Sequence, residues 1–429
     1  MFASHFITAA TAVSRRTPTA ISTIASLRPI VFSNVSPVLA FSTHAPSRMK
    51  LIADFRSDTL TQPTDEMFEI MKKASRSDDV YEVDSSIRSL EEYVAKLTGH
   101  EAGLFCVSGT MTNQLAFRSS LLMPPASILC DTRSHVYRYE VGGLASLSNL
   151  TVYPAQALSN NGHHLTVHDL QREFIQDDGD IHMAPTRLIS LENTLDGTIM
   201  PLQEIQAIRQ FATENNVRLH LDGARIWNAA VALGCNLKDL TMQFDSVSLC
   251  FSKGLGAPIG SILVGNQALI NKARHFRKML GGGWRQAGGL AAVAHWCVDH
   301  VWPTMKETHT LAKQLAIGLE REGRGAKVFI PVETNMVFLD LAGSGIRLSE
   351  LSRQLESRKG INIGNKDAPE TQTQVRLVLH WQISKQAVDD FLEVVRDLAA
   401  NAQRTGTSDS LQADRQSVYG SGARTDNVD

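Results

Sequence analysis

The sequence predicts an α/β protein in which a mostly parallel seven-stranded sheet is flanked by helices and followed by a smaller α+β domain. The first observation is that short apolar runs alternate with helical patterns from Arg56 onward, which is typical of parallel strands joined by crossover helices. The second is that these runs are apolar throughout, as expected for strands covered on both faces. The third is that the order of elements changes after about residue 300, which indicates a second unit.

The elements follow one another in a simple order. A loop from residue 56 leads to a helical pattern over 85–97, which ends at Gly99, a suitable C-terminal stop. The expected strands of the large sheet are 101–107, 126–131, 150–155, 186–192, 217–222, 246–251 and 260–264. Helical stretches intervene, notably 202–215 and 267–279, and a long helix over 287–322 is interrupted near Trp302-Pro303.

The second unit is expected to contain a strand at 333–341, a helix at 349–358 and a strand at 374–379. We therefore divide the folded chain into a large domain over 51–300 and a small C-terminal domain over 301–404. The two ends of the chain have a different composition and are excluded from the fold.

Composition restricts the possible functions. The 429 residues are 43% hydrophobic, and no apolar stretch is long enough to span a bilayer. The formal net charge is −2 with both signs interspersed, which argues against nucleic acid and anionic membranes as partners and favours a small-molecule ligand. Five cysteines, an odd number without paired spacing, argue against a disulfide framework or a zinc site, so no metal is expected and a reducing compartment fits best.

The terminal segments differ from the rest of the chain. Residues 1–50 contain several basic residues among many Ser, Thr and Ala, and the first acidic residue is Asp54. That is the composition of a mitochondrial transit peptide, although a disordered extension without an addressing role, on a cytoplasmic protein, has the same appearance. Residues 405–429 have almost no apolar content and are expected to be disordered.

Two residues at the ends of expected strands carry the strongest chemical signal. Asp222 ends the run before Gly223, and Lys253 follows the run over 246–251, 31 positions later. Open α/β sheets place reactive groups at such strand ends. A lysine that forms an imine and an aspartate that pairs with a pyridinium nitrogen are the two groups that pyridoxal phosphate needs. We therefore expect this cofactor, whereas Lys253 taken without that context would be read first as a surface lysine at a strand end.

A phosphate site is expected where the first strand meets the next helix. Ser108-Gly109-Thr110 follows the apolar run ending at Val107 and precedes a helical pattern over 111–122. Free backbone N–H groups at a helix start, with the Thr110 hydroxyl, can bind a phosphate. The same three residues also make an ordinary strand-to-helix turn with an N-cap. No Gly-rich dinucleotide fingerprint follows this strand, so NAD binding has little support.

Six motifs occur together in one order along the chain. They are Arg56-Ser57-Asp58-Thr59, Ser108-Gly109-Thr110, Ser190-Leu191-Glu192-Asn193-Thr194, Asp222-Gly223-Ala224-Arg225, Ser252-Lys253-Gly254-Leu255-Gly256 and Gly281-Gly282-Gly283-Trp284-Arg285-Gln286. In this order and spacing the chain resembles the low-specificity L-threonine aldolases, from about residue 51 to 400. The resemblance implies an aspartate aminotransferase-like fold and cleavage of L-threonine or L-allo-threonine to glycine and acetaldehyde.

The resemblance also implies which residues bind the cofactor. Lys253 would hold pyridoxal phosphate through an imine, Asp222 would pair with the pyridine nitrogen, and Gly109 and Thr110 would bind the phosphate. His135 matches a histidine that stacks on the cofactor ring in the family, although a structural histidine at a strand end would look the same.

Further residues would contact the substrate. Ser57, Arg225 and Arg376 match the groups that hold its carboxylate, where a guanidinium can bind both oxygens in one plane. Arg376 also fits a salt-bridged residue of the small domain. His182 matches a second histidine near the substrate hydroxyl, so the base is expected to be His135 or a water oriented by His135 and His182.

The remaining assignments concern neighbouring loops. Tyr139 is expected to line the same site or to belong to the core. Arg285 follows three glycines, and in the family the corresponding arginine reaches the phosphate of a neighbouring subunit, which implies a homodimer or homotetramer. The chain departs from many bacterial relatives at Leu195-Asp196, where those have a histidine after Glu-Asn-Thr.

Other reactions use the same cofactor-binding groups. Aminotransferases, β-eliminating lyases and serine hydroxymethyltransferase share the lysine, the aspartate and the phosphate site, because fold does not dictate reaction. A scaffold that binds the cofactor without turnover is a further alternative, against which the intact Lys253, Asp222 and Arg376 argue. The motifs at 56–59 and 281–286 favour the aldolase.

Overall fold

The protein is described by a computed structural model that covers residues 52–120, 124–159 and 162–405. The expectations for residues 1–50 and for the tail after Thr405 lie outside these ranges and stay predictions. No helix in the described ranges combines the length and the apolar character needed to cross a membrane. All five cysteines are among the described residues, and each is a free thiol.

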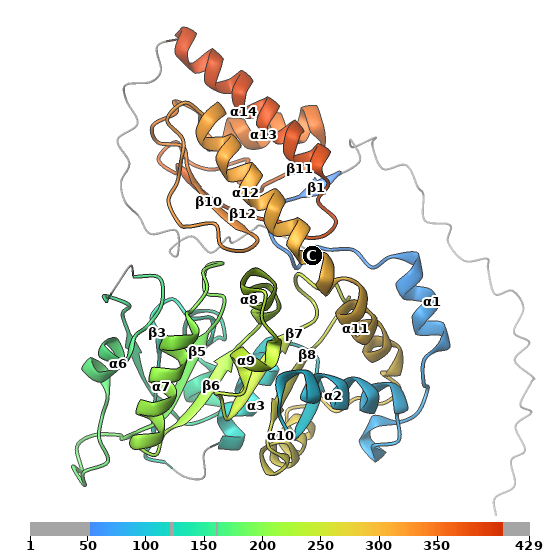
Figure 1. The fold of residues 1–429 in the computed structure, drawn as a ribbon, viewed down its shortest axis with the longest axis vertical. Coiled ribbons are helices and arrows are strands. Elements are labelled where there is room, and N and C mark those ends of the chain that lie inside the picture. The colour runs from blue at the N-terminus through green and yellow to red at the C-terminus, as the bar shows by residue number, and fades with distance from the viewer. Residues whose placement is uncertain (1–51, 121–123, 160–161, 406–429) are drawn as a thin grey trace, which may run out of the picture. The chain divides into compact units, whose positions relative to one another are not determined.

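The large sheet has the seven strands that the sequence predicts, in the spatial order β2-β8-β7-β6-β5-β3-β4 (Figure 1). Their bounds are β2 Ala102–Cys106, β3 Ser127–Asp131, β4 Thr151–Ala155, β5 Thr186–Glu192, β6 Arg218–Asp222, β7 Ser246–Cys250 and β8 Ser261–Gly265. All adjacent pairs are parallel except those of β8, which runs antiparallel to both β2 and β7. Pro154 is tolerated in β4 because this strand lies at the edge of the sheet.

Alternate residues of the strands face two different cores. In β2, Phe105 packs into the largest cluster, whereas Leu104 and Cys106 pack into a second one. In β3, Leu129 faces the largest cluster, and its neighbour Ile128 faces the opposite side. This alternation follows from the period of two in a strand, so each apolar run must be apolar throughout. The expectation of a sheet covered on both faces is confirmed.

Helices cover both faces. The cluster on one face takes residues from α1, α2, α7, α8, α9 and α11, and those on the other take residues from α3, α5 and α10. The helices of this part are α1 Asp65–Lys73, α2 Ser85–Thr98, α3 Gly109–Ser120, α4 His135–Arg138, α5 Gly143–Ser146, α6 Val167–Glu173, α7 Leu202–Glu214, α8 Ile226–Leu233, α9 Leu237–Thr241, α10 Gln267–Met279 and α11 Gly288–His300.

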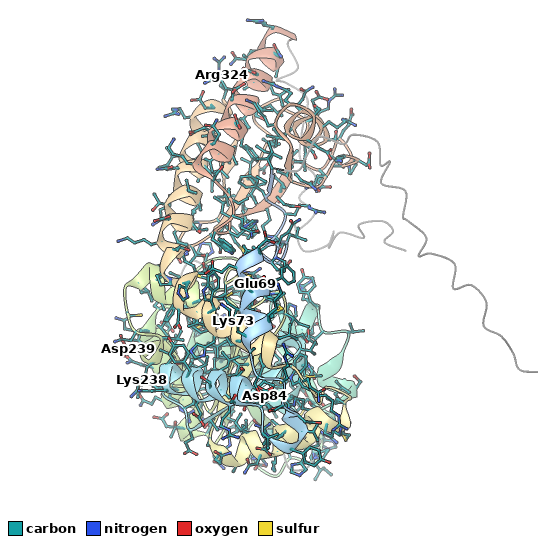
Figure 2. All side chains as sticks on the ribbon, turned by 90° about the vertical axis from the view of Figure 1, so that its right-hand side faces the viewer. Glu69, Lys73, Asp84, Lys238, Asp239 and Arg324 are labelled. Carbon is teal, nitrogen blue, oxygen red and sulfur yellow. The ribbon has the colours of Figure 1, made fainter. Side chains whose placement is uncertain are left out.

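Local capping fixes where several helices begin. The carboxylate of Asp84, labelled in Figure 2, accepts from the backbone N–H groups of Ser86 and Ile87 and so caps α2. Gly99 ends this helix with a φ of 74°, as the sequence predicts. Asp239, also labelled there, belongs to the capping box of α9 with Asn236.

One stretch that was expected to be a loop contains a helix. The segment over 56–84 includes α1, whose N-cap Thr64 accepts from the N–H of Met67. Only Met67 is fully buried in this helix, and Phe68 beside it is half exposed. A helix with so narrow an apolar face has a weak periodic signal, which is why the sequence pattern missed it.

The small domain is built on a three-stranded antiparallel sheet in the order β12-β10-β9. The strands and helices of this part are β1 Ala53–Asp54, β9 Lys327–Val328, β10 Met336–Asp340, β11 Ile361–Asn362, β12 Gln374–Val378, α12 Met305–Glu322, α13 Leu348–Lys359 and α14 Lys385–Thr405. The interruption at Trp302-Pro303 is a 3₁₀ turn over Trp302–Thr304 between α11 and α12. The sequence missed the short strands β1, β9 and β11, which have two residues each.

The two cores do not divide the chain at one point. Ala53 and Phe55 pack with the C-terminal core, and β1 pairs in parallel with β11, so the start of the folded chain belongs with the small domain. Helix α12 contributes Met305 to the large core and Ala312 to the small one. The division into 51–300 and 301–404 is therefore wrong for the segment around Phe55, because a strand of only two residues does not reveal its partner strand.

Phe55 gives a direct test of this arrangement. Its ring is fully buried and meets Phe391 edge to face, with ring centroids 5.5 Å apart. We expect Phe55→Ala to lower the free energy of unfolding by about 3–5 kcal/mol, because it empties a packed site. The control Phe68→Ala removes a half-exposed ring from α1 and should change it by no more than about 0.5 kcal/mol. Urea unfolding compares them, and equal losses would contradict the assignment of Phe55 to the second core.

Candidate active site

Six strands end at the same edge of the large sheet. Strands β3, β4, β5, β6 and β7 are mutually parallel, and β2 points the same way because it is separated from β7 by one antiparallel strand. The register pairs Glu192 with Asp222 at the ends of β5 and β6. The residues that follow these strands therefore meet at one edge although they are far apart in sequence.

Lys253 lies in the turn after β7. The N–H of Gly256 donates to the carbonyl of Lys253 at 2.7 Å and closes this turn. Gly256 has a φ of 76°, and a Cβ there would lie 2.4 Å from Nε1 of Trp381, so the turn requires glycine. Within the described ranges, no hydrogen bond or ion pair engages the amine of the half-buried Lys253. This amine is available to react.

Asp222 is buried at the end of β6 and held in one orientation. Its Oδ2 accepts from Nδ2 of Asn113 at 2.7 Å, and its Oδ1 accepts from the N–H of Ala224 at 3.1 Å. Asn113 lies on α3, 109 positions earlier in the chain. Hydrogen bonds to the charged form of a carboxylate favour that form, which suits a partner for a cationic ring nitrogen.

The start of α3 presents open backbone donors. Ser108 caps the helix, since its Oγ accepts from the N–H of Met111 at 3.2 Å. In the described part of the chain, the N–H groups of Gly109 and Thr110 have no acceptor. A Cβ at Gly109 would lie 2.9 Å from Sγ of Cys250, so only glycine brings the helix start this close to the strand ends. Such donors fit a phosphate.

His135 begins α4 and is held from two sides. Its backbone N–H donates to Oε2 of Glu192 at 2.8 Å, and its Nδ1 lies 3.0 Å from Oε1 of Glu140. The ring of Tyr139 lies nearby, with the centroids of the His135 and Tyr139 rings 5.8 Å apart.

Glu192 lies beside this histidine. Burial and the negative charge of Asp222 raise the pKa of Glu192 well above its ordinary value. The positive charge of Lys253 opposes this rise. Glu192 therefore interacts with both Asp222 and Lys253, the two residues expected to hold the cofactor.

Arg225 is engaged by a residue that the sequence analysis did not assign. Its Nε and Nη2 donate to the two carboxylate oxygens of Asp58 at 2.8 and 2.6 Å. Burial alone would raise the pKa of Asp58, but Arg225, with Lys253 and Arg376 nearby, lowers it below its ordinary value. Arg225 therefore lies at the site as expected, with two of its three nitrogens committed to Asp58. Ser57 precedes this pair in the chain and accepts from the Thr59 hydroxyl at 2.9 Å.

Arg376 extends from β12 of the small domain. Its neighbours Val375 and Leu377 pack into the small core, so alternation directs Arg376 to the opposite face. No hydrogen bond or ion pair within the described ranges involves its guanidinium. Water reaches the side chain, yet the surrounding protein and the positive charge of Arg225 lower its pKa below the ordinary value. Asp58, Asp196 and Tyr139 also act on it.

Asp196 occupies the loop where the chain departs from many bacterial relatives. Burial raises its pKa to about 6, against the opposing effects of Arg133 and the more distant Arg376 and Arg225. The loop therefore supplies a carboxyl group with a raised pKa near Arg225 and Arg376, where many bacterial relatives have a histidine.

Two of the expected site residues are not brought to this group. His182 is exposed in the loop before β5, at the end opposite to Glu192. A seven-residue strand spans roughly 20 Å, so the structure of one copy does not bring His182 beside Glu192, and its assignment to the site stays a prediction. Arg285 is 58% exposed and pairs with Asp78 at 2.8 Å. It lies in the loop after α10, as the glycine run predicts.

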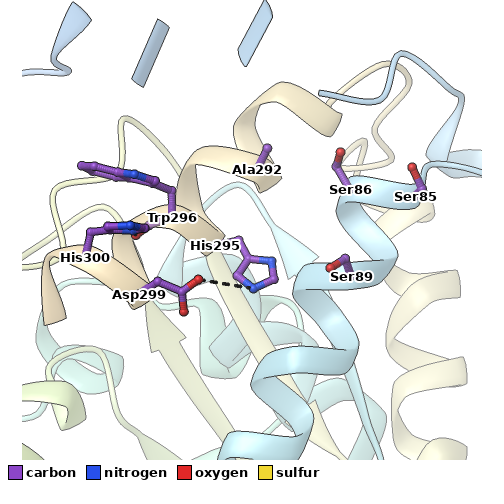
Figure 3. Close-up of a pocket in the computed structure, with 8 residues that line it drawn as sticks. All are labelled: Ser85, Ser86, Ser89, Ala292, His295, Trp296, Asp299 and His300. Atoms are coloured by element: carbon purple, nitrogen blue, oxygen red, sulfur yellow. Dashed lines mark hydrogen bonds and ion pairs between the residues drawn. The ribbon is translucent and has the colours of Figure 1, made fainter. Parts of the chain in front are cut away.

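A separate hollow of about 360 Å³ lies at the surface between α2 and α11 (Figure 3). Its walls are formed by Ser85, Ser86, Ser89, Ala292, His295, Trp296, Asp299 and His300. The acid in it is already engaged, because the Tyr93 hydroxyl donates to Asp299 at 2.7 Å and the Tyr93 ring stacks on His295. This hollow shares no residue with the group around Lys253 and does not belong to it.

The sequence analysis gave no role to four polar residues that organise the group, although two of them, Asp58 and Glu192, lie in its motifs. They are Asp58, Asn113, Glu140 and Glu192, all of which bond to an expected site residue. Glu192 had a usable signal, since it ends a buried strand with a charge. Asn113 interrupts the apolar face of a helix, which is a weaker signal because one polar residue on such a face is common.

Comparisons with known proteins agree with this geometry. Residues 54–344 match the family described as "Beta-eliminating lyase". The "Low-specificity L-threonine aldolase" of Candida albicans is 46% identical over 342 residues, which cover 79% of this chain and 87% of that protein. The corresponding enzyme of Saccharomyces cerevisiae is 49% identical over 297 residues, covering 69% and 76%. The solved structure of Leishmania major threonine aldolase superimposes with a TM-score of 0.67 at 21% identity, covering 81% and 99%.

The buried pair of Asp58 and Arg225 can be tested by its pH dependence. We expect Asp58→Asn to lower the free energy of unfolding at pH 7 by about 3–5 kcal/mol, because it leaves a buried guanidinium without its partner. The lowered pKa of Asp58 means that the native pair is fully present above the ordinary value and is lost as the pH falls. The difference between the two proteins should therefore shrink only below about pH 4.

A surface pair provides the control. Asp397 bonds to Arg358 at 2.6 Å with both side chains partly exposed, so Asp397→Asn should cost no more than about 1 kcal/mol. Urea unfolding between pH 3 and pH 7 measures both variants. An Asp58→Asn effect as small as the control, or one that disappears already at pH 6, would contradict the described pair.

Proposed function

The chain belongs to the beta-eliminating lyase family, and from that premise we propose that it is a pyridoxal phosphate-dependent aldolase that cleaves L-threonine to glycine and acetaldehyde. One observation carries the proposal: the free amine of Lys253, the oriented carboxylate of Asp222 and the open N–H groups of α3 lie at one edge of the sheet. The names of the relatives support the choice of substrate.

The residues present fit pyridoxal phosphate. Lys253 would bind the aldehyde carbon, Asp222 the ring nitrogen, and the N–H groups of Gly109 and Thr110 the phosphate, while His135 would lie against the ring. Glycine at position 109 supports this placement, because a Cβ there would meet Sγ of Cys250 and push the start of α3 away from the strand ends. When bound, the cofactor withdraws electrons from the bonds to the substrate Cα, which is the chemistry that no side chain of the protein supplies.

The arginines would orient the substrate. The guanidinium of Arg376 is unpaired within the described ranges and would bind the carboxylate, together with the remaining nitrogen of Arg225 and the hydroxyl of Ser57. Fixing the carboxylate decides which bond to Cα stands perpendicular to the ring, and for this reaction it is the Cα–Cβ bond. Tyr139 lies close to both His135 and Arg376 and would border the side chain of the substrate.

Proton transfer would then complete the reaction. His135 accepts the proton of the β-hydroxyl, the Cα–Cβ bond breaks to release acetaldehyde, and a proton delivered to Cα gives glycine. Since His182 lies far from this site in its own chain, we assign the base to His135 alone. Keto acid or ammonia as the product from threonine would instead favour an aminotransferase or an eliminating lyase.

We propose further that the active form contains at least two copies. Several large apolar side chains near the loops that flank the site are exposed, among them Tyr81 at 75%, Met279 at 65% and Val141 at 100%. Tyr81 and Met279 lie close in sequence to the paired Asp78 and Arg285. A second copy that covers these side chains would bring its Arg285 towards the phosphate site. The neutral N–H groups of α3 do not compensate the full negative charge of a bound phosphate, and this arginine would.

The reaction is tested on the purified protein with pyridoxal phosphate and L-threonine. We expect acetaldehyde and glycine in equal amounts, and we expect Lys253→Ala to reduce kcat by at least about a thousandfold, because the covalent group is lost. Lys385→Ala removes a surface lysine that pairs with Asp389 and should leave the rate unchanged. Acetaldehyde production by wild type without dependence on Lys253 would contradict the proposed site.

The shared site is tested by mixing two inactive variants. Lys253→Ala keeps Arg285, and Arg285→Ala keeps Lys253, so a mixed dimer contains one native site if the arginine comes from the other copy. After unfolding and joint refolding we expect about a quarter of the native activity, since random pairing gives half mixed dimers with one site each. Activity that stays at the level of the separate variants would show that Arg285 acts within its own chain or not at all.

A further inference from the structure

We propose that Asn113 is a positioning residue that couples the carboxylate of Asp222 to the imidazole of His135. The inference rests on the proposed function, in which these two side chains contact the cofactor. Asn113 is buried on α3, one turn after the expected phosphate site, and it is 1% exposed. It acts on the site only through the groups to which it donates.

The amide of Asn113 stands between two carboxylates. Its Nδ2 donates to Oδ2 of Asp222 at 2.7 Å and to Oε1 of Glu140 at 2.9 Å. The same oxygen of Glu140 lies 3.0 Å from Nδ1 of His135. Ligand atoms of Asp222, Glu140 and His135 all lie within 4.8 Å of one another. Two carboxylates this close repel each other unless donors separate them, and the two N–H bonds of Asn113 provide those donors.

The orientation of the amide is fixed from behind. Nε2 of His220 lies 3.1 Å from Oδ1 of Asn113, and Nδ1 of His220 lies 2.8 Å from the Ser246 hydroxyl. Burial lowers the pKa of His220 to about 4, so its imidazole is neutral and carries one proton. Since ionised carboxylates cannot donate, the amide nitrogen must face them and the amide oxygen must accept from His220. The proton of His220 is therefore on Nε2, and the Ser246 hydroxyl donates to Nδ1.

The same reasoning settles the tautomer of His135. An ionised Glu140 can only accept through Oε1, so in the neutral form of His135 the Nδ1 carries the proton and the Nε2 is an acceptor. The other oxygen of Glu140 accepts from Nε2 of Gln114 at 2.6 Å, which holds the carboxylate in place. A base for the β-hydroxyl needs a free acceptor nitrogen, and Nε2 is the one that this network supplies.

Asp222 receives its orientation from the same amide. Asn113 binds Oδ2 from α3, while Ala224 binds Oδ1 from the turn after β6. Glu192 from β5 and Lys253 from the turn after β7 also act electrostatically at this edge. Without Asn113, the oxygen of Asp222 that it binds would face Glu140 with no donor between them. One side chain thus controls both the ring-nitrogen partner and the base.

Neighbouring residues on α3 provide a matched pair of variants. Asn113 and Gln114 are both buried and both donate to Glu140, but only Asn113 donates to Asp222. Asn113→Ala removes both links, and Gln114→Ala removes only the one to Glu140. Asn113→Asp keeps nearly the same volume but cannot donate to Asp222 and Glu140 at once. It therefore tests the connection between these two carboxylates even if the alanine variant folds poorly. Thermal unfolding checks that each variant is folded.

The readouts are the dissociation constant of pyridoxal phosphate and the pH midpoint of the change in the absorption spectrum of the bound cofactor. We expect Asn113→Ala and Asn113→Asp to weaken cofactor binding about tenfold or more, which corresponds to about 1.4 kcal/mol, and to move the midpoint. We expect Gln114→Ala to change both values clearly less than the Asn113 variants do while it shifts the pH profile of kcat/KM, because it reaches the cofactor only through Glu140 and His135 and leaves Asp222 in place.

Two results would overturn the coupling. One is native cofactor affinity and a native midpoint in both Asn113 variants. The other is an equal change in the Gln114 and Asn113 variants, which would place the whole effect at Glu140. Because wild-type threonine cleavage is measured in the same preparations, a failure of this inference is distinguished from a failure of the proposed function.

Discussion

The arrangement depends on one constraint, which is that parallel strands end at the same edge of their sheet. Six strands of the large sheet point in one direction, so residues between positions 109 and 253 meet without any long loop to bring them together. The antiparallel β8 does not disturb this, because it lies between β2 and β7 and leaves them parallel to each other. The helix that follows β2 therefore begins beside the turn that holds Lys253. A rigid sheet edge is a better support for chemistry than a mobile loop.

Asp58 connects this edge to the small domain. It binds Arg225 from the large domain, and Nδ2 of Asn335 from the small domain approaches it at 3.4 Å. Its charge also compensates Lys253 and Arg376, so one buried anion lies among three cations. Arg376, whose guanidinium has no hydrogen bond or ion pair within the described ranges, favours a ligand carboxylate. The segment around Phe55, which packs with the small core, delivers Asp58 to this position. The two cores thus share a charged residue at the site itself.

Much of the fold and part of the site could be predicted from the sequence. The seven long strands were predicted within two residues because most are runs of buried apolar residues, with the edge strand β4 less buried than the others. Lys253 and Asp222 could be found because they end two of those runs. The missed parts had weak or absent local signals: α1 buries only Met67, and β1 finds its partner about 300 residues away in β11. Asn113 and Glu140 are defined only by partners distant in sequence. His182 is not found with the group in one copy, because a motif gives an order along the chain, whereas the edge of the sheet at which a loop lies depends on strand direction.

A crystal structure of the protein with pyridoxal phosphate tests the central claim most directly. The account predicts a covalent bond between Nζ of Lys253 and the aldehyde carbon, and a ring nitrogen within hydrogen-bonding distance of the Asp222 carboxylate. The phosphate should lie at the start of α3. A cofactor bound elsewhere, or one whose ring nitrogen points away from Asp222, would contradict the account.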